Sequence, residues 1–189
     1  MFLMPTPSAR TLTALASSSA LWQLDGSAAT FTGADIDITS TDDAIYSDAT
    51  YNAANWPMTY SYSLDTTPDN SSACSGLFDD AETATFIGQS AGGEGNLNSM
   101  SKSWGIRHSD GVCLFGSGAS PGTLSGGGVV SGNVIKWVIA ADGTVTIEVN
   151  DVQEFTFGAS KANGILIRWM HGASNANKTF VNCTWSYYV

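Results

Sequence analysis

Two glutamates in the segment EVNDVQE have types and spacing that could support acid–base chemistry. If a tight turn joins the strands that carry Glu148 and Glu154, their carboxyl groups would face each other roughly 5 Å apart, which retaining glycosidases require. Lys136 is expected opposite Glu148 on the preceding strand, however, and a solvated ion pair explains the same residues. We therefore expect no catalytic residues and keep a glycosidase using Glu148 and Glu154 as a second alternative.

The other polar motifs add no catalytic or metal-binding set. The tripeptide HSD at 108–110 contains the residue types of a hydrolase triad, but adjacent residues of one turn cannot form its relay. The glycine-rich segments GGEG and SGGGVVSG lack the lysine of a phosphate-binding loop. Four aspartates lack the spacing of a calcium loop and suit solvated strand edges: Asp35, Asp37, Asp42 and Asp43. We expect no metal and no cofactor.

The three cysteines, Cys74, Cys113 and Cys183, lie far apart, and no C-x-x-C occurs. Neither histidine is close to a cysteine in the sequence, so a zinc site is disfavoured. Three buried thiols are the simplest expectation. One disulfide with one free thiol is the alternative.

Aromatic and amide side chains near strand ends are the candidates for ligand or partner contact. Trp137, Trp169 and Trp185 occupy inward-facing strand positions and are expected in the core. An aromatic ring at a loop rim can stack on a sugar or anchor a partner, and Trp56, close to Tyr51, is the leading candidate. The complete candidate set is Tyr51, Trp56, Asn98, Trp104, His171 and Asn175.

Composition limits the classes of function. The 189 residues are 43% hydrophobic but only 13% charged, and the formal net charge is −10. A negative field of this kind disfavours nucleic acid and anionic membranes, whose binding depends on cationic contacts to phosphate. No segment approaches the roughly 20 apolar residues of a membrane-spanning helix. The Ser, Thr and Gly content suits a β-rich extracellular or particle-surface protein.

The first 20 residues differ from the rest of the chain. Prolines interrupt the opening, and the later apolar run is short for a signal peptide, so residues 1–20 are expected to form an uncleaved extended arm before a domain at 21–189. Only Ala9–Ala20 could hold a short helix. The arm's apolar residues would gain stability by docking on a neighbouring subunit: Phe2, Leu3, Met4, Leu12 and Leu15.

The segment NVIKWVIAADGTVTIEVNDVQEFTF predicts a hairpin with a definite register. If residues 141–143 form a three-residue loop, Gly143 takes its left-handed position. One face then consists of apolar cross-strand pairs and the other carries Lys136 opposite Glu148. The apolar pairs are Ile139 with Val145, Trp137 with Ile147, and Ile135 with Val149.

The other strand signals recur at short intervals between turn signals. We expect residues 73–80 and 83–89 to form a strand pair, and residues 103–108 and 111–115 to form a hairpin. Further strands are expected at 30–38, 58–65, 164–170 and 178–189. The glycine- and serine-rich segments 89–103 and 116–132 are interpreted as surface loops. This pattern predicts an all-β antiparallel sandwich of two sheets.

The order of these signals resembles a known family. The run NLNSMSKSWGIRHSDGVCLFG, a glycine-rich loop, and SGNVIKWVIAADGTVTIEVND resemble the centre of SPRY domains. The resemblance covers roughly residues 22–185 and implies a concanavalin A-like jelly roll. Asn133, Lys136 and Asp151 depart from that family's pattern, and laminin-G-like or lectin-like relatives fit almost as well.

Three functions therefore remain at the level of sequence. The leading expectation is a non-enzymatic virion protein, a phage capsid decoration or fibre component at the virion surface, docked to other subunits through residues 1–20. The first alternative is an extracellular lectin-like module, with loops 89–103, 116–132 and 171–178 forming a shallow carbohydrate site. The second is the glycosidase.

Overall fold

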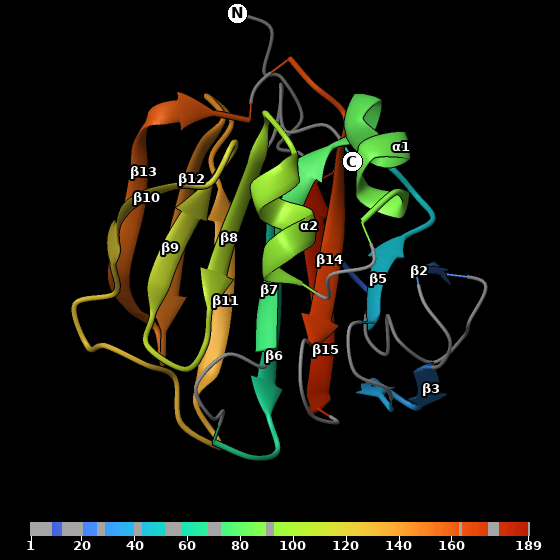
Figure 1. Cartoon of the computed structure of the whole chain (residues 1–189). Helices are drawn as coiled ribbons and strands as arrows, with labels where there is room; N and C mark the ends of the chain where they lie inside the picture. Colours follow the sequence, from blue (N-terminus) through green and yellow to red (C-terminus); the bar gives the residue numbers. More distant parts are fainter. Residues whose placement is uncertain are drawn as a thin grey trace, which may run out of the picture.

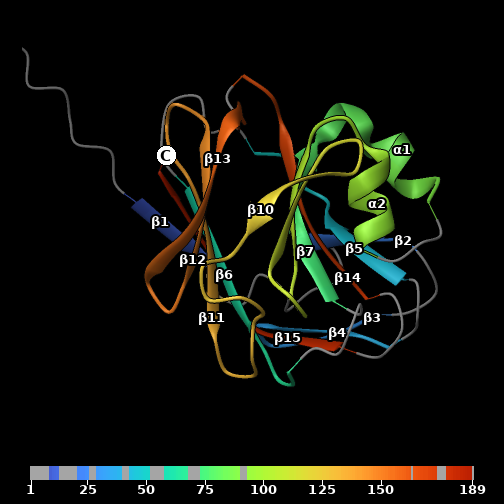
Figure 2. The same cartoon turned by 60° about the vertical axis from the view of Figure 1, so that its left-hand side comes forward.

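Two antiparallel β-sheets pack face to face in the computed structural model. It describes residues 9–12, 21–25, 29–39, 43–51, 58–67, 73–89, 93–162, 164–173 and 178–188. Figure 2 shows the two layers side by side, with both α-helices beyond the seven-stranded layer. The predicted all-β two-sheet sandwich is confirmed. No helix in the described part of the chain is long and apolar enough to span a membrane.

The eight-stranded sheet contains the predicted hairpin near one edge. Its strands follow the order β13 (Val152–Lys161), β12 (Thr144–Val149), β11 (Val134–Ile139), β6 (Met58–Leu64), β15 (Lys178–Tyr188), β4 (Asp35–Ile38) and β3 (Ala29–Thr32). The eighth strand, β1 (Ala9–Leu12), also pairs with β15. Strand β4 pairs with the first part of β15, and β1 pairs with its last part.

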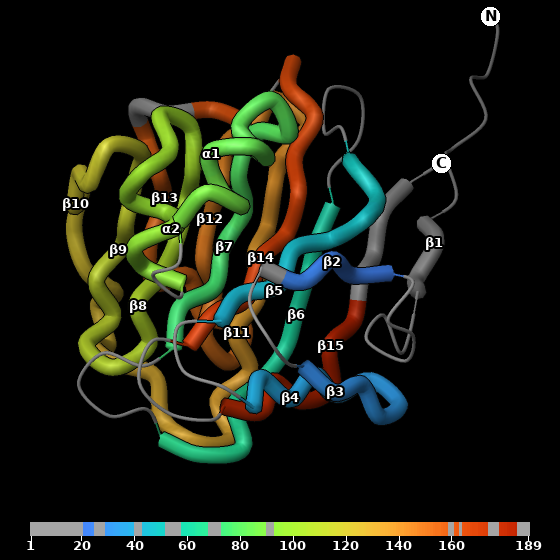
Figure 3. Tube along the Cα trace, turned by 45° about the vertical axis from the view of Figure 1, so that its right-hand side comes forward, coloured from blue at the N-terminus to red at the C-terminus, as the bar shows by residue number. Residues whose placement is uncertain are grey.

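The seven-stranded sheet forms the second layer. Its order is β10 (Ala119–Thr123), β9 (Val112–Phe115), β8 (Ser103–Arg107), β7 (Ala73–Asp79), β14 (Ile167–Ala173), β5 (Asp43–Ser47) and β2 (Trp22–Asp25). Figure 3 shows β10 and β13 at one side of the molecule and β2, β3 and β4 at the other. The edge strands β10 and β13 of the two sheets contact each other.

Period-two alternation explains why the core forms between the sheets. Ile135, Trp137 and Ile139 are fully buried, whereas Lys136 and Val138 between them are half-buried on the outer face. Trp169 is also fully buried, as expected. A Leu or Ile side chain gains roughly 2 kcal/mol on burial, so this inner layer supplies most of the driving force for folding.

A second apolar cluster lies on the outer face of the seven-stranded sheet. The short helices α1 (Thr83–Ile87) and α2 (Glu94–Ser99) cover that face in Figure 1. Phe86 from α1 stacks on Phe78 of β7, with ring centroids 4.7 Å apart, and Leu97 from α2 is fully buried. A 3₁₀ turn, η2 (Asp80–Glu82), leads from β7 into α1.

The register of the β11–β12 hairpin is the expected one. Ile139 pairs with Val145, Trp137 with Ile147, and Lys136 with Glu148. Gly143 has φ of 82°, the left-handed value that the three-residue loop requires.

Four predictions of secondary structure are wrong. Residues 30–38, expected as one strand, form the two paired strands β3 and β4, and residues 119–123 form β10 inside a segment interpreted as a surface loop. Residues 83–87 form a helix instead of a strand paired with residues 73–79, because Phe86 is buried against the outer face of β7. Residues 94–99 form α2 inside a segment interpreted as a surface loop.

The described part of the N-terminal arm differs from the expectation. Ala9–Leu12 is a strand, and no helix starts there. Leu12 pairs with Trp185 of the same chain, so this part of the arm extends the chain's own sheet and does not stand free for a neighbouring subunit. The other apolar arm residues lie outside the described residues: Phe2, Leu3, Met4 and Leu15.

The three cysteines are free and buried, as expected. Burial raises the pKa of the Cys113 and Cys183 thiols to about 12 and that of Cys74 further. These thiols are therefore protonated and unreactive at neutral pH.

Candidate functional site

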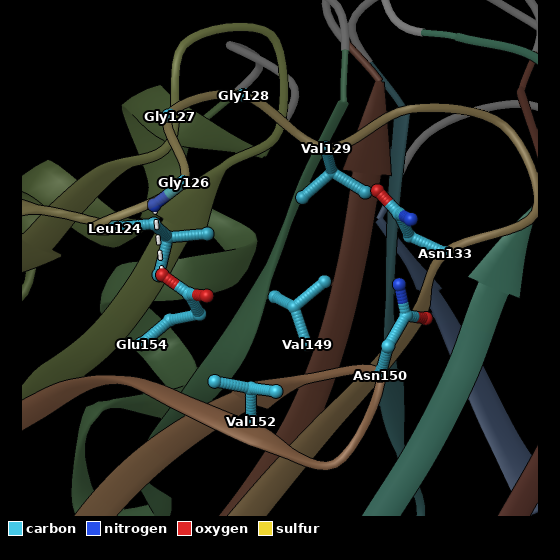
Figure 4. A pocket seen from close by; sticks show the side chains of 10 residues that line it. All are labelled: Leu124, Gly126, Gly127, Gly128, Val129, Asn133, Val149, Asn150, Val152 and Glu154. Atoms are coloured by element: carbon cyan, nitrogen blue, oxygen red, sulfur yellow. Dashed lines mark hydrogen bonds between the residues drawn. The ribbon is translucent and has the colours of Figure 1, made fainter.

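A pocket of about 280 Å³ opens where the segment between β10 and β11 meets the turn between β12 and β13. Figure 4 shows side chains from both segments converging on it. Its ten lining residues are Leu124, Gly126, Gly127, Gly128, Val129, Asn133, Val149, Asn150, Val152 and Glu154. The site thus joins two parts of the chain about 20 residues apart.

Backbone hydrogen bonds hold the glycine-rich wall in place. The Leu124 amide donates to the Gly111 carbonyl at 2.9 Å, and the Val129 amide donates to the His108 carbonyl at 2.7 Å. Both carbonyls belong to the turn between β8 and β9, which contains the HSD tripeptide. That tripeptide forms a turn, as expected, and its role here is to anchor the pocket wall.

Glycine is needed in this wall because two backbones approach closely. A Cβ on Gly128 would lie 2.3 Å from the Ser109 carbonyl oxygen. A Cβ on Gly111, which has φ of 71°, would lie 2.2 Å from the Gly127 carbonyl oxygen. The glycines thus allow a tight, fixed contact between loop and turn.

Two asparagines present amide donors at one end of the pocket. Backbone N–H groups can only donate, so the side-chain oxygen of each asparagine must be the acceptor in its contact with the backbone. The Val130 amide donates to Oδ1 of Asn133, and the Val134 amide donates to Oδ1 of Asn150, both at 2.9 Å. The Nδ2 group of each asparagine is its remaining hydrogen-bonding group and can only donate. Figure 4 shows the Asn150 amide nitrogen directed toward Asn133 at this end of the pocket.

The turn that carries Asn150 has a left-handed backbone at both central residues. Asn150 has φ of 52° and Asp151 has φ of 63°, and Val149 pairs with Val152 across them. Two positive φ values define the tight hairpin turn whose twist matches that of the flanking strands. Asparagine tolerates this conformation better than most residues, which explains its position here.

Glu154 closes the other end of the pocket. Its Oε2 accepts a hydrogen bond from the Gly126 amide at 2.8 Å. The second carboxylate oxygen points toward the pocket interior in Figure 4. One oxygen is thus fixed by the wall and the other is positioned for a ligand.

The predicted pairing of Glu148 with Glu154 is wrong. Glu148 pairs with Gln153, Ile147 pairs with Phe155, and the register shift between them inserts Glu154 as an extra residue. Glu148 instead contacts Lys136 at 2.7 Å on the outer face of the sheet, whereas Glu154 lines the pocket. The two carboxylates therefore cannot flank one glycosidic bond.

The polar groups that converge on the pocket are suited to binding a small ligand, and they do not form a metal site. The pocket combines two amide donors and one carboxylate acceptor with a floor of four aliphatic side chains, from Leu124, Val129, Val149 and Val152. Among the described residues, no cluster of three His, Cys, Asp or Glu side chains could hold a metal ion. A mostly apolar cavity with a few placed polar groups is the usual form of a small-ligand site.

Most sequence-predicted contact residues lie elsewhere. Trp104 is 1% exposed and His171 is fully buried, so the prediction that they contact a ligand is wrong. Trp104 is enclosed because its side chain packs in the core between the two sheets. Tyr51 packs partly buried against the core and bridges to Ile167. Trp56 and Asn175 lie outside the described residues.

Asn98 is half-buried on α2, and its Oδ1 is buried without a hydrogen-bond partner. This helix packs on the outer face of the seven-stranded sheet, against β7, β8 and β9. The structure therefore does not bring Asn98 into the pocket. Of the three loops proposed for a shallow sugar site, 116–132 is the one that contributes lining residues.

The buried histidines belong to a polar network inside the core. His171 lies 2.5 Å from the Tyr60 hydroxyl through Nε2 and 2.7 Å from the Ser75 hydroxyl through Nδ1. Burial lowers the pKa of His171 well below its usual value. This histidine is neutral and satisfied, and it has no access to a ligand in solution.

The pocket residues that sequence reasoning did not assign to a site are Asn133, Val149, Asn150 and Val152. Two signals were available, since the glycine-rich segment and the Asn-Asp turn both stood out. The contact between these two segments could not be predicted from the sequence, because it depends on the β8–β9 turn that holds the glycine-rich segment in place.

Comparison with known proteins shows the fold. No protein-family model matches the chain, and no curated protein matches it. Among solved structures, the Emp47p carbohydrate recognition domain superimposes with a TM-score of 0.61 at 11% identity, covering 94% of each chain.

SPRY domains are similar to about the same degree. The SPRY domain of human HERC1 gives a TM-score of 0.58 at 13% identity, covering 93% of this chain and 92% of that one. The TRIM65 PSpry domain gives 0.56 at 10% identity, with coverage of 89% and 87%. The chain therefore has the concanavalin A-like jelly roll that its sequence resembled.

Proposed function

We propose that this chain is a non-enzymatic recognition module that binds a carbohydrate in the pocket between residues 124–133 and 149–154. The observation that carries the proposal is the convergence of donors, an acceptor and an aliphatic floor on one small cavity. The similar Emp47p domain is described as a carbohydrate recognition domain, which supports the same class of ligand.

The hydrogen-bonding groups match sugar hydroxyls. A hydroxyl both donates and accepts, so it can donate to the Glu154 carboxylate or accept from Nδ2 of Asn133 or Asn150. The C–H face of a sugar ring fits against Val149 and Val152, and Val152 is 58% exposed. The volume of about 280 Å³ suits one or two sugar residues.

Binding without hydrolysis is supported by the carboxylates. Glu154 is the only carboxylate among the ten lining residues, whereas both common glycosidase mechanisms need two. The amide side chains of Asn133 and Asn150 cannot take the second role, because an amide neither protonates a leaving group nor activates water.

A glycan array followed by calorimetry tests the proposal. We expect Val152→Arg to abolish binding, because the new side chain would fill the pocket and pair with Glu154. Val130→Arg is the matched control, since Val130 is also exposed but does not line the pocket. Binding that survives Val152→Arg, or an array without any hit, would contradict the proposal.

We propose display on a viral particle as a second candidate. The weakly charged composition and the apolar residues before β1 support it, as does the −10 net charge, which disfavours binding to nucleic acid. Since β1 pairs within its own chain, docking would depend on the apolar residues ahead of it.

Sedimentation of the full chain and of a Phe2→Ser, Leu3→Ser double variant tests that candidate. Assembly that is lost in the variant, with glycan binding kept, would support it. A monomer in both cases would contradict it.

A further inference from the structure

We infer that the pocket prefers a ligand with a protonated amine, such as an amino sugar, and rejects acidic sugars. This inference rests on the proposed carbohydrate function and names the chemical class of its ligand. It follows from the position of the Glu154 carboxylate relative to the cations of the described residues.

Glu154 is a fixed carboxylate in a partly enclosed site. The Gly126 amide holds Oε2 at 2.8 Å, and the Ser125 hydroxyl donates to the Glu154 backbone carbonyl at 3.1 Å. These contacts set the position of both side chain and backbone. Oε1 then projects into the pocket beside Val149 and Val152 (Figure 4).

No lysine or arginine lines the pocket, and no ion pair to Glu154 occurs within the described residues. The cations of the adjoining segments contact other carboxylates. Lys136 lies 2.7 Å from Glu148 and 2.8 Å from Asp151, on the outer face of the sheet. Arg107 is paired with Glu94 and Asp110 on the other side of the β8–β9 turn. The pocket thus holds a negative charge that a ligand can complement.

The opposite end of the pocket is neutral. Asn133 and Asn150 present N–H donors, which bind hydroxyl or carbonyl oxygens without charge. A ligand with an amine at one end and hydroxyls at the other matches this polarity. A uronic or sialic acid would place a carboxylate in the field of Glu154 and of a chain with net charge −10, which is unfavourable.

Calorimetry on the full chain with four probes tests the inference. The probes are a β-1,4-linked glucosamine tetramer, its fully N-acetylated counterpart, a galacturonic acid tetramer and lysine amide. A charge-assisted hydrogen bond is stronger than a neutral one, so we expect the glucosamine tetramer to bind roughly fivefold more tightly than the acetylated one. The acidic tetramer should not bind.

Two variants separate a site effect from the general attraction of cations to an acidic chain. Glu154→Gln and Glu148→Gln each remove one negative charge from the same hairpin, but Glu148 is on the outer face. We expect Glu154→Gln to remove the preference for the amine and Glu148→Gln to keep it. Measurements at 0.3 M salt screen the long-range field.

The outcomes distinguish this inference from the carbohydrate function. Equal binding of the two tetramers by the natural chain would overturn the amine preference and leave carbohydrate binding standing. Binding of lysine amide without any sugar would keep the amine site and overturn the carbohydrate function. If none of the four probes binds, the amine preference is overturned, whatever other ligand the pocket binds.

Discussion

The Tyr62 hydroxyl lies 2.9 Å from Nε2 of His108 and joins the two sheets through the core. Tyr62 is on β6 of the eight-stranded sheet, and His108 follows β8 of the other. His108 Nδ1 lies 2.8 Å from the Ala73 carbonyl oxygen, which can only accept, so Nδ1 carries the proton and Nε2 accepts from Tyr62. Burial lowers the pKa of His108 to about 4.

This neutral histidine should make stability depend on pH. An unfolded chain protonates His108 near pH 6.5, whereas the folded chain does so only near pH 4, so unfolding takes up a proton between these values. Stability should therefore fall as pH drops through this window, by about 3 kcal/mol for His108. Urea unfolding from pH 7.5 to 5 measures the slope.

His108→Gln is the diagnostic variant for that prediction. This variant should be less stable at pH 7.5. The pH dependence of its free energy of unfolding should correspond to the uptake of up to one proton fewer. His171, whose pKa is also lowered, keeps its own contribution in the variant. An unchanged slope would mean that His108 is accessible to protons in the folded chain.

Gly76 on β7 should not accept a side chain. A Cβ there would lie 2.1 Å from the Trp104 carbonyl oxygen and 2.9 Å from the Gly105 Cα, both backbone atoms of β8. We expect Gly76→Ala to lower the free energy of unfolding by about 2 kcal/mol or more. Gly158→Ala, on β13 with nothing within 4 Å, is the control and should be close to neutral. Chemical denaturation of both variants gives the comparison.

Gly128 should matter for the pocket as well as for stability. Gly128→Ala would press a Cβ against the Ser109 carbonyl oxygen and move the wall away from the β8–β9 turn. We expect a loss of about 2 kcal/mol in stability, with weaker binding of any pocket ligand. Gly126→Ala places its Cβ at 3.6 Å from the Glu154 carboxylate, an ordinary contact, and should fold normally. If the two variants melt alike, the wall is not held by this close approach.

The β12–β13 turn should prefer glycine at position 151. Asp151 has φ of 63°, which is strained for a residue with a Cβ. Asp151→Gly and Asp151→Ala both lose the contact with Lys136, but only glycine relieves the strain. We therefore expect the glycine variant to be more stable than the alanine variant by about 1 kcal/mol, measured by thermal unfolding. The reverse order would show that the turn relaxes to negative φ.

Local pairing explains what could be predicted about the fold. The register of β11 and β12 was predictable because their loop has three residues and a one-residue slip would place Trp137 against Glu148. The same alternation in other segments was sufficient to predict a two-sheet sandwich. The expected core positions of Trp137 and Trp169 followed from that period, and both are buried.

The next turn shows the limit of that reasoning. The turn between β12 and β13 has two central residues, so Val149 pairs with Val152 and Glu148 pairs with Gln153 instead of Glu154. A register shift beyond that pair leaves Glu154 as an extra residue, which alternation alone does not reveal. Residues 83–87 are a helix because Phe86 fits an apolar surface on the outer face of β7, and that surface exists only after the sheet has formed. Trp104 is in the core because its side chain faces the opposite sheet, and that packing exists only in the folded sandwich.

The order of residue types was therefore enough to predict the all-β class, the central hairpin with its register, and the buried thiols. These depend on side-chain period and on contacts between residues close along the chain, which lose little entropy when the loop closes. The pocket was decided only by the tertiary structure. It needs the β8–β9 turn to hold the glycine-rich wall against Glu154 and the Asn150 turn, and that contact depends on which strands become neighbours in space.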